Sequence, residues 1–123
     1  MPANACIYAQ RIPLSTLSPH LIVPRLMDGA ISRIREARDA NLNRHDAQFQ
    51  LSMDKSCVLI DGLKNTLDWT EGVEVAAHLD DVYSYIQVQL GHARYQEGGM
   101  SLDICESILC EVREAWGAVG YEG

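Results

Sequence analysis

Aromatic residues and long apolar runs are scarce in this chain. Its 123 residues include five tyrosines, two tryptophans and one phenylalanine, so aliphatic side chains must supply most of a core. No apolar run reaches the length of a membrane span, and no signal segment opens the chain. The length is sufficient for one domain to bury a core without cross-links. We therefore expect one domain, located in the cytoplasm.

Spacings typical of metal sites are also missing. None of the four cysteines forms a C-x-x-C pair, and without a signal peptide reduced thiols in apolar positions are expected. The four histidines stand singly, at no ligand spacing. We predict no metal ligands and no cofactor. The remaining alternative of this kind is a small metal-binding bundle that uses His78, His92 and the cysteines.

Positive charge is in deficit, with ten lysines and arginines against 17 aspartates and glutamates and a net charge of −7. This balance disfavours nucleic acid and anionic membranes as partners. The adjacent carboxylates Asp80 and Asp81, and the pair Glu111 and Glu114, fall on predicted polar helix sides. No glycine-rich phosphate loop, nucleophile elbow or Glu-x-x-His pair is present. We predict that the chain is not an enzyme and has no catalytic residues.

Helical periodicity, by contrast, is strong, and it is clearest between Leu79 and Tyr95. One apolar stripe predicts a core face there: Val75, Leu79, Val82, Tyr83, Ile86, Leu90 and Ala93. A second stripe beside it contains Tyr85, Val88 and His92. A helix with two stripes is either central in its bundle or borders a groove that another molecule fills.

Similar patterns predict three further helices, and no segment shows strand periodicity. The predicted helices span about 18–39, 47–67, 73–96 and 101–118, after an irregular N-terminal arm over 1–17. Ser18 precedes a proline suited to a first helical turn, and Ser101 is a candidate N-cap. Pro24 predicts either a kink, which we favour, or a helix that begins there. Four amphipathic helices with short connections predict an all-α, antiparallel up-and-down four-helix bundle as one domain over 1–123.

Two features favour a binding protein. Ile7 and Tyr8 are large apolar residues in the arm, which either rest on the bundle or form a flap over an apolar surface. The second stripe and the second helix together offer a candidate client-binding groove: Leu59, Leu63, Tyr85 and Val88. The alternative for these four residues is ordinary core.

Several short segments, in order along the chain, resemble the flagellar export chaperone family FliS. The matching segments are Tyr8-Ala9-Gln10, Ser18-Pro19-His20, Leu26-Met27-Asp28-Gly29-Ala30, Leu79 with Val82-Tyr83-Ser84-Tyr85-Ile86, and Glu114-Ala115-Trp116. The resemblance covers nearly the whole chain, and its specificity comes from order and spacing together.

The resemblance implies a cytoplasmic helical bundle that binds the C-terminal segment of flagellin. Such a chaperone prevents premature polymerisation and assists delivery to the flagellar type III export apparatus. Further candidate partners are the export gate and other flagellar proteins, and a weak homodimer is also left open. The resemblance gives Tyr8 the role of a flap in the free chaperone. The alternative function is a helical-bundle chaperone or adaptor for a different flagellar or regulatory client.

Overall fold

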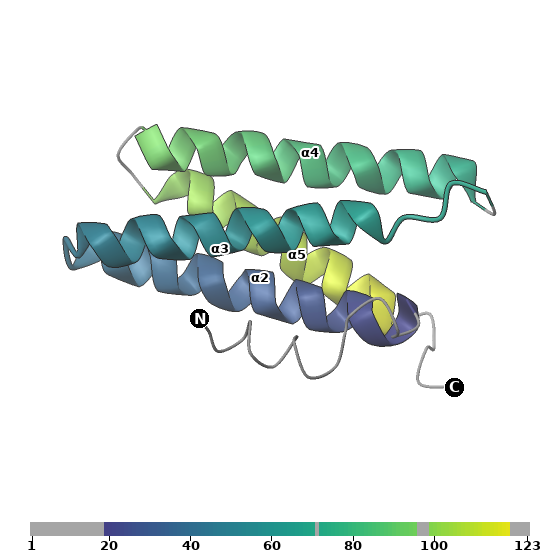
Figure 1. Ribbon diagram of the computed structural model, residues 1–123, viewed down its shortest axis with the longest axis horizontal. Coiled ribbons are helices and arrows are strands. Elements are labelled where there is room, and N and C mark those ends of the chain that lie inside the picture. The colour runs from purple at the N-terminus through teal and green to yellow at the C-terminus, as the bar shows by residue number, and fades with distance from the viewer. Residues whose placement is uncertain (1–18, 71, 96–98, 119–123) are drawn as a thin grey trace.

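The computed structural model describes residues 19–70, 72–95 and 99–118, and these residues form four helices (Figure 1). The helices are α2 (Pro19–Leu42), α3 (Asp46–Asn65), α4 (Val73–Tyr95) and α5 (Met100–Ala118). No strand occurs among the described residues. The predicted all-α four-helix bundle is therefore confirmed. The predicted arm over residues 1–17 lies outside the described residues.

Helix α2 runs without interruption through Pro24. The alternative in which helix begins at Pro24 is therefore wrong. The helix continues to Leu42 and is stopped by Arg44, whose φ of 58° lies in the left-handed region. His45 N–H then donates to the carbonyl of Ala40 at 2.8 Å, which satisfies one of the last carbonyls of the helix.

Local hydrogen bonds also set the ends of the later helices. Thr66 closes α3, since its hydroxyl donates to the carbonyl of Leu63 at 2.6 Å. At the start of α5, the N–H of Asp103 donates to the carbonyl of Gly99 at 2.9 Å. Ser101 lies inside this helix, so its predicted role as N-cap is wrong. The turn at Gly99 takes the place just before the helix instead.

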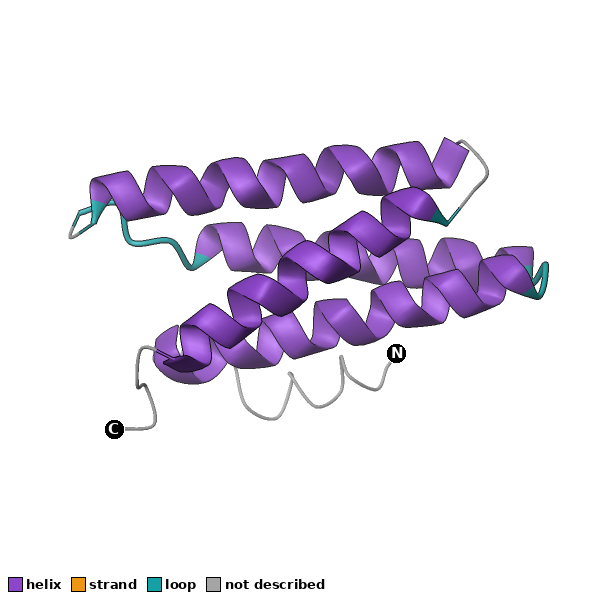
Figure 2. Cartoon of the chain, turned by 180° about the vertical axis from the view of Figure 1, so that it is seen from behind, coloured by secondary structure: helices purple, strands orange, loops and turns teal. Residues whose placement is uncertain are grey.

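Successive helices run antiparallel and pack against each other, and α5 closes the bundle by returning to α2 (Figure 1). The contacts between α2 and α3 are the most extensive, whereas α4 packs mainly against α3 and α5. Figure 2 shows α5 crossing the other helices obliquely. The outer side of α4 faces away from the other three helices (Figure 1).

The core is aliphatic, as the composition predicts. The apolar residues of α2 that recur at helical spacing are all buried: Val23, Leu26, Met27, Ala30, Ile31, Ile34 and Ala37. Helix α4 contributes Tyr83, Ile86, Leu90 and Ala93. Val75, which we predicted on the same core face, is 64% exposed, and the smaller Ala76 is buried in the first turns of α4. The prediction for Val75 is wrong because the predicted apolar stripe faces the core only beyond the first turns of α4.

One glycine of α2 and one of α3 face leucines across the contact between these helices. A methyl group at Gly62 would lie 3.5 Å from Cδ1 of Leu26, and one at Gly29 would lie 3.4 Å from Cδ1 of Leu59. Each glycine therefore receives a leucine from the opposite helix. Both glycines therefore lie within the contact between α2 and α3, which is the most extensive in the bundle.

Candidate functional site

The outer side of α4 carries the two predicted groove residues that are exposed. Tyr85 is 47% and Val88 is 53% exposed, so neither belongs to the core of the chain. Between the two alternatives for the second stripe, the structure therefore excludes a central helix. Tyr95, at 84% exposure, continues the same side two turns beyond Val88.

Leu63 does not lie on this surface. It has no exposed area and packs in the core, so its predicted place on a surface groove is wrong. The inward face of α3 contains two serines among its apolar residues: Phe49, Ser52, Met53, Ser56, Ile60 and Leu63. Because serine is polar, the spacing of apolar residues alone does not identify this face. Their burial is compatible with the core because the Ser56 hydroxyl donates to the Ser52 carbonyl at 2.9 Å.

Leu59 is half-buried and points toward α2 rather than α4. Its Cδ1 lies over Gly29, on the side of α3 that packs against the first helix. The four predicted residues are therefore not brought together, and the prediction of one groove lined by all of them is wrong. Tyr85 and Val88 share one face of α4, whereas Leu59 and Leu63 serve the packing of α3.

Six exposed residues of α4 recur at intervals of three and four and form a single line along its outer side. We call this line the outer stripe: His78, Asp81, Tyr85, Val88, His92 and Tyr95. The second stripe predicted from the sequence contains the middle of this line, Tyr85, Val88 and His92. Tyr95 was not predicted, although it continues the same interval from His92, which is a signal that could have identified it.

Polar contacts hold α4 against α3 and so orient the outer stripe. The Lys64 ammonium donates to the Ser84 hydroxyl at 3.0 Å and lies 3.7 Å from the Asp80 carboxylate. The Gln87 amide donates to Asp61 at 2.7 Å, and Arg94 pairs with Asp54 at 2.8 Å. These bonds run along the α3 side of the helix, beside the apolar members of the stripe. They fix the rotation of α4 and leave Tyr85 and Val88 facing outward.

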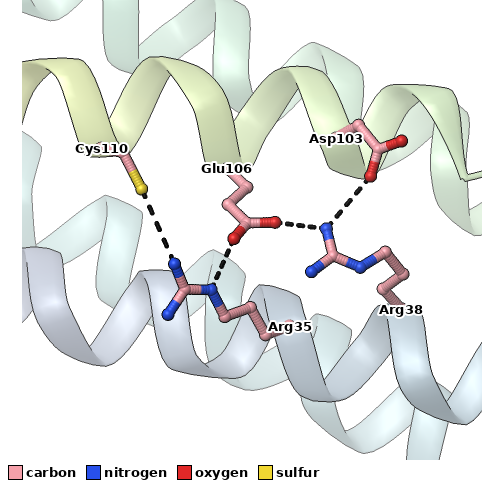
Figure 3. A network of polar contacts seen from close by, with 5 residues as sticks. All are labelled: Arg35, Arg38, Asp103, Glu106 and Cys110. Atoms are coloured by element: carbon pink, nitrogen blue, oxygen red, sulfur yellow. Dashed lines mark hydrogen bonds and ion pairs between the residues drawn. The ribbon is translucent and has the colours of Figure 1, made fainter.

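A second polar network joins α2 to α5 on another side of the bundle (Figure 3). The Glu106 carboxylate accepts hydrogen bonds from both Arg35, at 2.5 Å, and Arg38, and Arg38 also pairs with Asp103 at 3.0 Å. Hydrogen bonds from Arg38 and Arg35 lower the pKa of Glu106 below 4.5. All these groups are mutually neutralised, which is typical of a structural clamp between helices.

The thiol at the centre of the core is protonated at ordinary pH. Burial raises the pKa of Cys105 to about 12, and its Sγ donates to the Ile86 carbonyl at 3.6 Å. Burial likewise raises the pKa of Tyr83 to about 12. Both groups are therefore neutral packing elements. The described ranges, 19–70, 72–95 and 99–118, contain no group of three histidine, cysteine or acidic side chains that could hold a metal ion.

The predicted flap residues Ile7 and Tyr8 lie outside the described residues, and their role stays a prediction. In the part of the chain that is described, no helix combines the length and the apolar character needed to cross a membrane.

Comparison with known proteins assigns the chain to a family. The family model described as "Flagellar protein FliS" matches residues 3–122. The chain belongs to the FliS family.

Three curated relatives carry related names. The chain is 33% identical over 101 residues to the flagellar secretion chaperone FliS of Salmonella typhimurium, covering 80% of this chain and 74% of that protein. It is 29% identical over 108 residues to flagellar secretion chaperone FliSB of Pseudomonas aeruginosa, covering 88% and 86% respectively. It is also 29% identical over 109 residues to the flagellar secretion chaperone FliS of Vibrio cholerae, covering 89% and 80%. The resemblance inferred from short segments is thereby confirmed.

Proposed function

We propose that this chain is a flagellar secretion chaperone that binds the C-terminal segment of flagellin in the cytoplasm. The observation that carries the proposal is the family match over residues 3–122. Chaperones are not a class of enzymes. The polar side chains are most concentrated in the clamp between α2 and α5, and their mutual neutralisation fits a structural role. The bound chaperone would prevent premature polymerisation and assist delivery to the type III export apparatus, with the export gate as a further partner.

The outer side of α4 supports this proposal physically. A disordered client segment gains apolar burial when it folds as an amphipathic helix on an apolar surface. Tyr85 and Val88 offer such a surface in the free chain, since about half of each side chain is exposed. We infer that these two residues contact the client. Leu59 and Leu63 would act indirectly, by holding α3 in place.

Calorimetric titration with a synthetic peptide tests the client. The peptide covers about 40 residues from the C-terminus of the host's flagellin, a length suited to coupled folding and binding. We expect a one-to-one complex, a negative heat-capacity change and a gain of helix in circular dichroism. If neither heat nor helix gain appears, flagellin's C-terminal segment is not the client, and another flagellar or regulatory protein takes its place.

A matched pair of variants tests the surface. Tyr85→Glu places a charge where the client would bury a ring, and we expect about tenfold weaker binding. Val58→Glu is the control, because Val58 is 67% exposed on α3 and outside the proposed surface. Leu63→Glu is unsuitable, since a charge in the core would disrupt folding. Equal binding by wild type and Tyr85→Glu would show that the client binds elsewhere.

A further inference from the structure

Exposed apolar side chains are most concentrated where α3 connects to α4. Trp69 is 46%, Val73 58% and Val75 64% exposed, and we call these three residues the turn patch. In no other stretch of seven residues within the described ranges are three large apolar side chains exposed. Single exposed apolar residues are ordinary on a protein surface, whereas a cluster that includes a tryptophan is typical of an interaction site.

A local hydrogen-bonded turn holds Trp69 at the surface. The Asp68 carboxylate accepts hydrogen bonds from the Thr70 N–H at 2.9 Å and from the Thr70 hydroxyl at 2.6 Å. These two bonds fix the backbone on both sides of Trp69. The indole is therefore presented on a preformed turn, so a contact with it costs little backbone entropy.

The first turn of α4 directs the two valines outward. The helix begins after Gly72, whose carbonyl accepts a hydrogen bond from the Ala76 N–H at 2.8 Å. Ala76 is buried and marks the inward side of this turn, whereas Val73 and Val75 are exposed, with the exposed Glu74 between them. Valine is a weaker helix former than alanine, so exposed valines here gain neither packing nor helix propensity. A contact from outside the described chain would bury them.

The charge around the turn patch is of one sign. Residues 65–93 include five carboxylates and no lysine or arginine. Lys64, at the border of this segment, is paired with Asp80 at 3.7 Å. The Glu74 side chain makes no hydrogen bond or ion pair within the described ranges. The turn patch is therefore an apolar surface with an acidic rim formed by Asp68 and Glu74.

We propose that the turn patch binds a basic, apolar segment of another protein. Aliphatic side chains of that segment cover Trp69 and the two valines, and its lysine or arginine side chains pair with Asp68 and Glu74. A cation can also stack on the exposed face of the indole, which attracts positive charge. Apolar burial supplies the affinity, and the acidic rim supplies the selectivity.

Charge selects this occupant among those that an apolar patch could bind. An anionic membrane surface is repelled by the carboxylates of residues 65–93. A second copy of this chain presents the same acidic rim and brings like charges together. An acidic segment meets the same repulsion. A segment with both aliphatic and basic side chains is attracted by the apolar surface and by its rim.

The turn patch is separate from the surface that we propose for the client. Tyr85 follows Val75 by ten residues, which corresponds to about 15 Å along α4. The inference therefore goes beyond the proposed function and does not depend on it. The two surfaces can be tested one at a time.

Nuclear magnetic resonance titration of the isotope-labelled full chain tests the proposal. The probes are two synthetic amphipathic peptides of about 14 residues, a length at which an isolated helix becomes marginally stable. Both carry leucine on one helix face, and they differ only in having lysine or glutamate on the other. We expect the lysine peptide to shift the amide signals of residues 68–70 and 72–75 and the indole signal of Trp69, and the glutamate peptide to leave them unchanged. Equal shifts with both peptides, or shifts confined to other residues, would overturn the proposal.

A matched pair of aromatic variants tests the patch itself. Trp69→Ala is expected to weaken binding of the lysine peptide at least about tenfold, because the indole is the largest apolar group of the patch. Tyr95→Ala removes an exposed ring at the other end of α4 and should bind the peptide like the wild type. Circular dichroism checks that both variants remain folded. Equal affinity of the two variants for the lysine peptide would contradict the proposal.

A charge reversal tests the acidic rim. Glu74→Lys is expected to weaken binding of the lysine peptide and to permit binding of the glutamate peptide. Tyr85→Glu, on the proposed client surface, should leave the affinity for the lysine peptide unchanged, so failure of client binding and failure of this inference are distinguishable. An unchanged peptide preference in Glu74→Lys would exclude the rim. Binding to anionic phospholipid vesicles, or a dimer, that Trp69→Ala abolishes would assign the patch to a membrane or to a second copy and overturn the proposal.

Discussion

The two sides of this bundle use similar residues in opposite ways. Between α2 and α3, glycines face leucines, and Leu26 and Leu59 fill the space that Gly62 and Gly29 leave. On the outer side of α4, Gly91 faces open space, and Tyr85 and Val88 are about half exposed. The first arrangement is completed by the chain itself. The second has the composition of a packing surface, and the described chain supplies nothing to cover it.

This difference shows that residue type alone does not identify a binding surface. Leu63 and Val88 are both aliphatic and both lie on amphipathic helices, yet one is fully buried and the other is 53% exposed. What separates them is the side of the helix on which they lie. Each helix packs against two others, and Leu63 lies on the packed side of α3 whereas Val88 lies on the outer side of α4. Apolar residues on an outer side are available to a partner.

Truncating one residue from each helix tests the contrast most directly. Leu63→Ala leaves a cavity in the core, and we expect the free energy of unfolding to fall by about 3 kcal/mol. Tyr85→Ala removes a partly exposed ring, and we expect a change within about 0.5 kcal/mol. Urea denaturation followed by circular dichroism measures both, at a concentration where the chain is monomeric. Comparable losses would mean that Tyr85 belongs to the core, which would remove the contrast.

The glycines give a second test with a smaller effect. Gly62→Leu would drive a large side chain into Leu26, and we expect a loss of about 1–3 kcal/mol. Gly91→Ala should instead stabilise the isolated chain by up to about 1 kcal/mol, because alanine is the better helix former and the added methyl meets nothing. Thermal unfolding of both variants at low concentration checks the signs. A destabilising Gly91→Ala would show that another part of the chain packs against α4 at this position.

The clamp between α2 and α5 is an intermediate case, because its charged side chains join the two helices through ion pairs rather than through apolar packing. Glu106→Gln weakens the hydrogen bonds to Arg35 and Arg38, and we expect a loss of about 1 kcal/mol at neutral pH. Glu111→Gln, an exposed change on the same helix, is the control.

The pH dependence of this effect has a definite sign. Because the pKa of Glu106 is lowered in the folded chain, the unfolded chain binds more protons near and below pH 4.5. The stabilisation is therefore complete above that pH and is lost as the pH falls through the folded pKa. Urea midpoints measured between neutral pH and pH 3 should converge for the wild type and Glu106→Gln. A constant difference across this range would show that the carboxylate's ionisation is not what joins the helices.

Much of the fold could be predicted from local patterns, whereas the site was only partly accessible. The inward face of α2 follows from the sequence because its apolar residues recur at helical spacing without interruption, and all of them are buried. The inward face of α3 was misjudged because Ser52 and Ser56 lie in the core, where small hydroxyls can bond to the preceding turn. Leu59 was assigned to the wrong neighbour, since periodicity gives a side chain's direction on its own helix but not the helix it meets.

The sequence by itself determined the four helices, their aliphatic core, the negative net charge that disfavours nucleic acid as a partner, and the resemblance to the FliS family. These properties depend on periodicity, composition and short ordered segments, which are local. The tertiary structure alone decided that Tyr85 and Val88 face outward while Leu63 is enclosed, and that Gly91 lacks the leucine that Gly29 and Gly62 receive. The reason is physical: a stripe is buried only if another helix packs on it, and which side of each helix is packed on is a property of the whole chain.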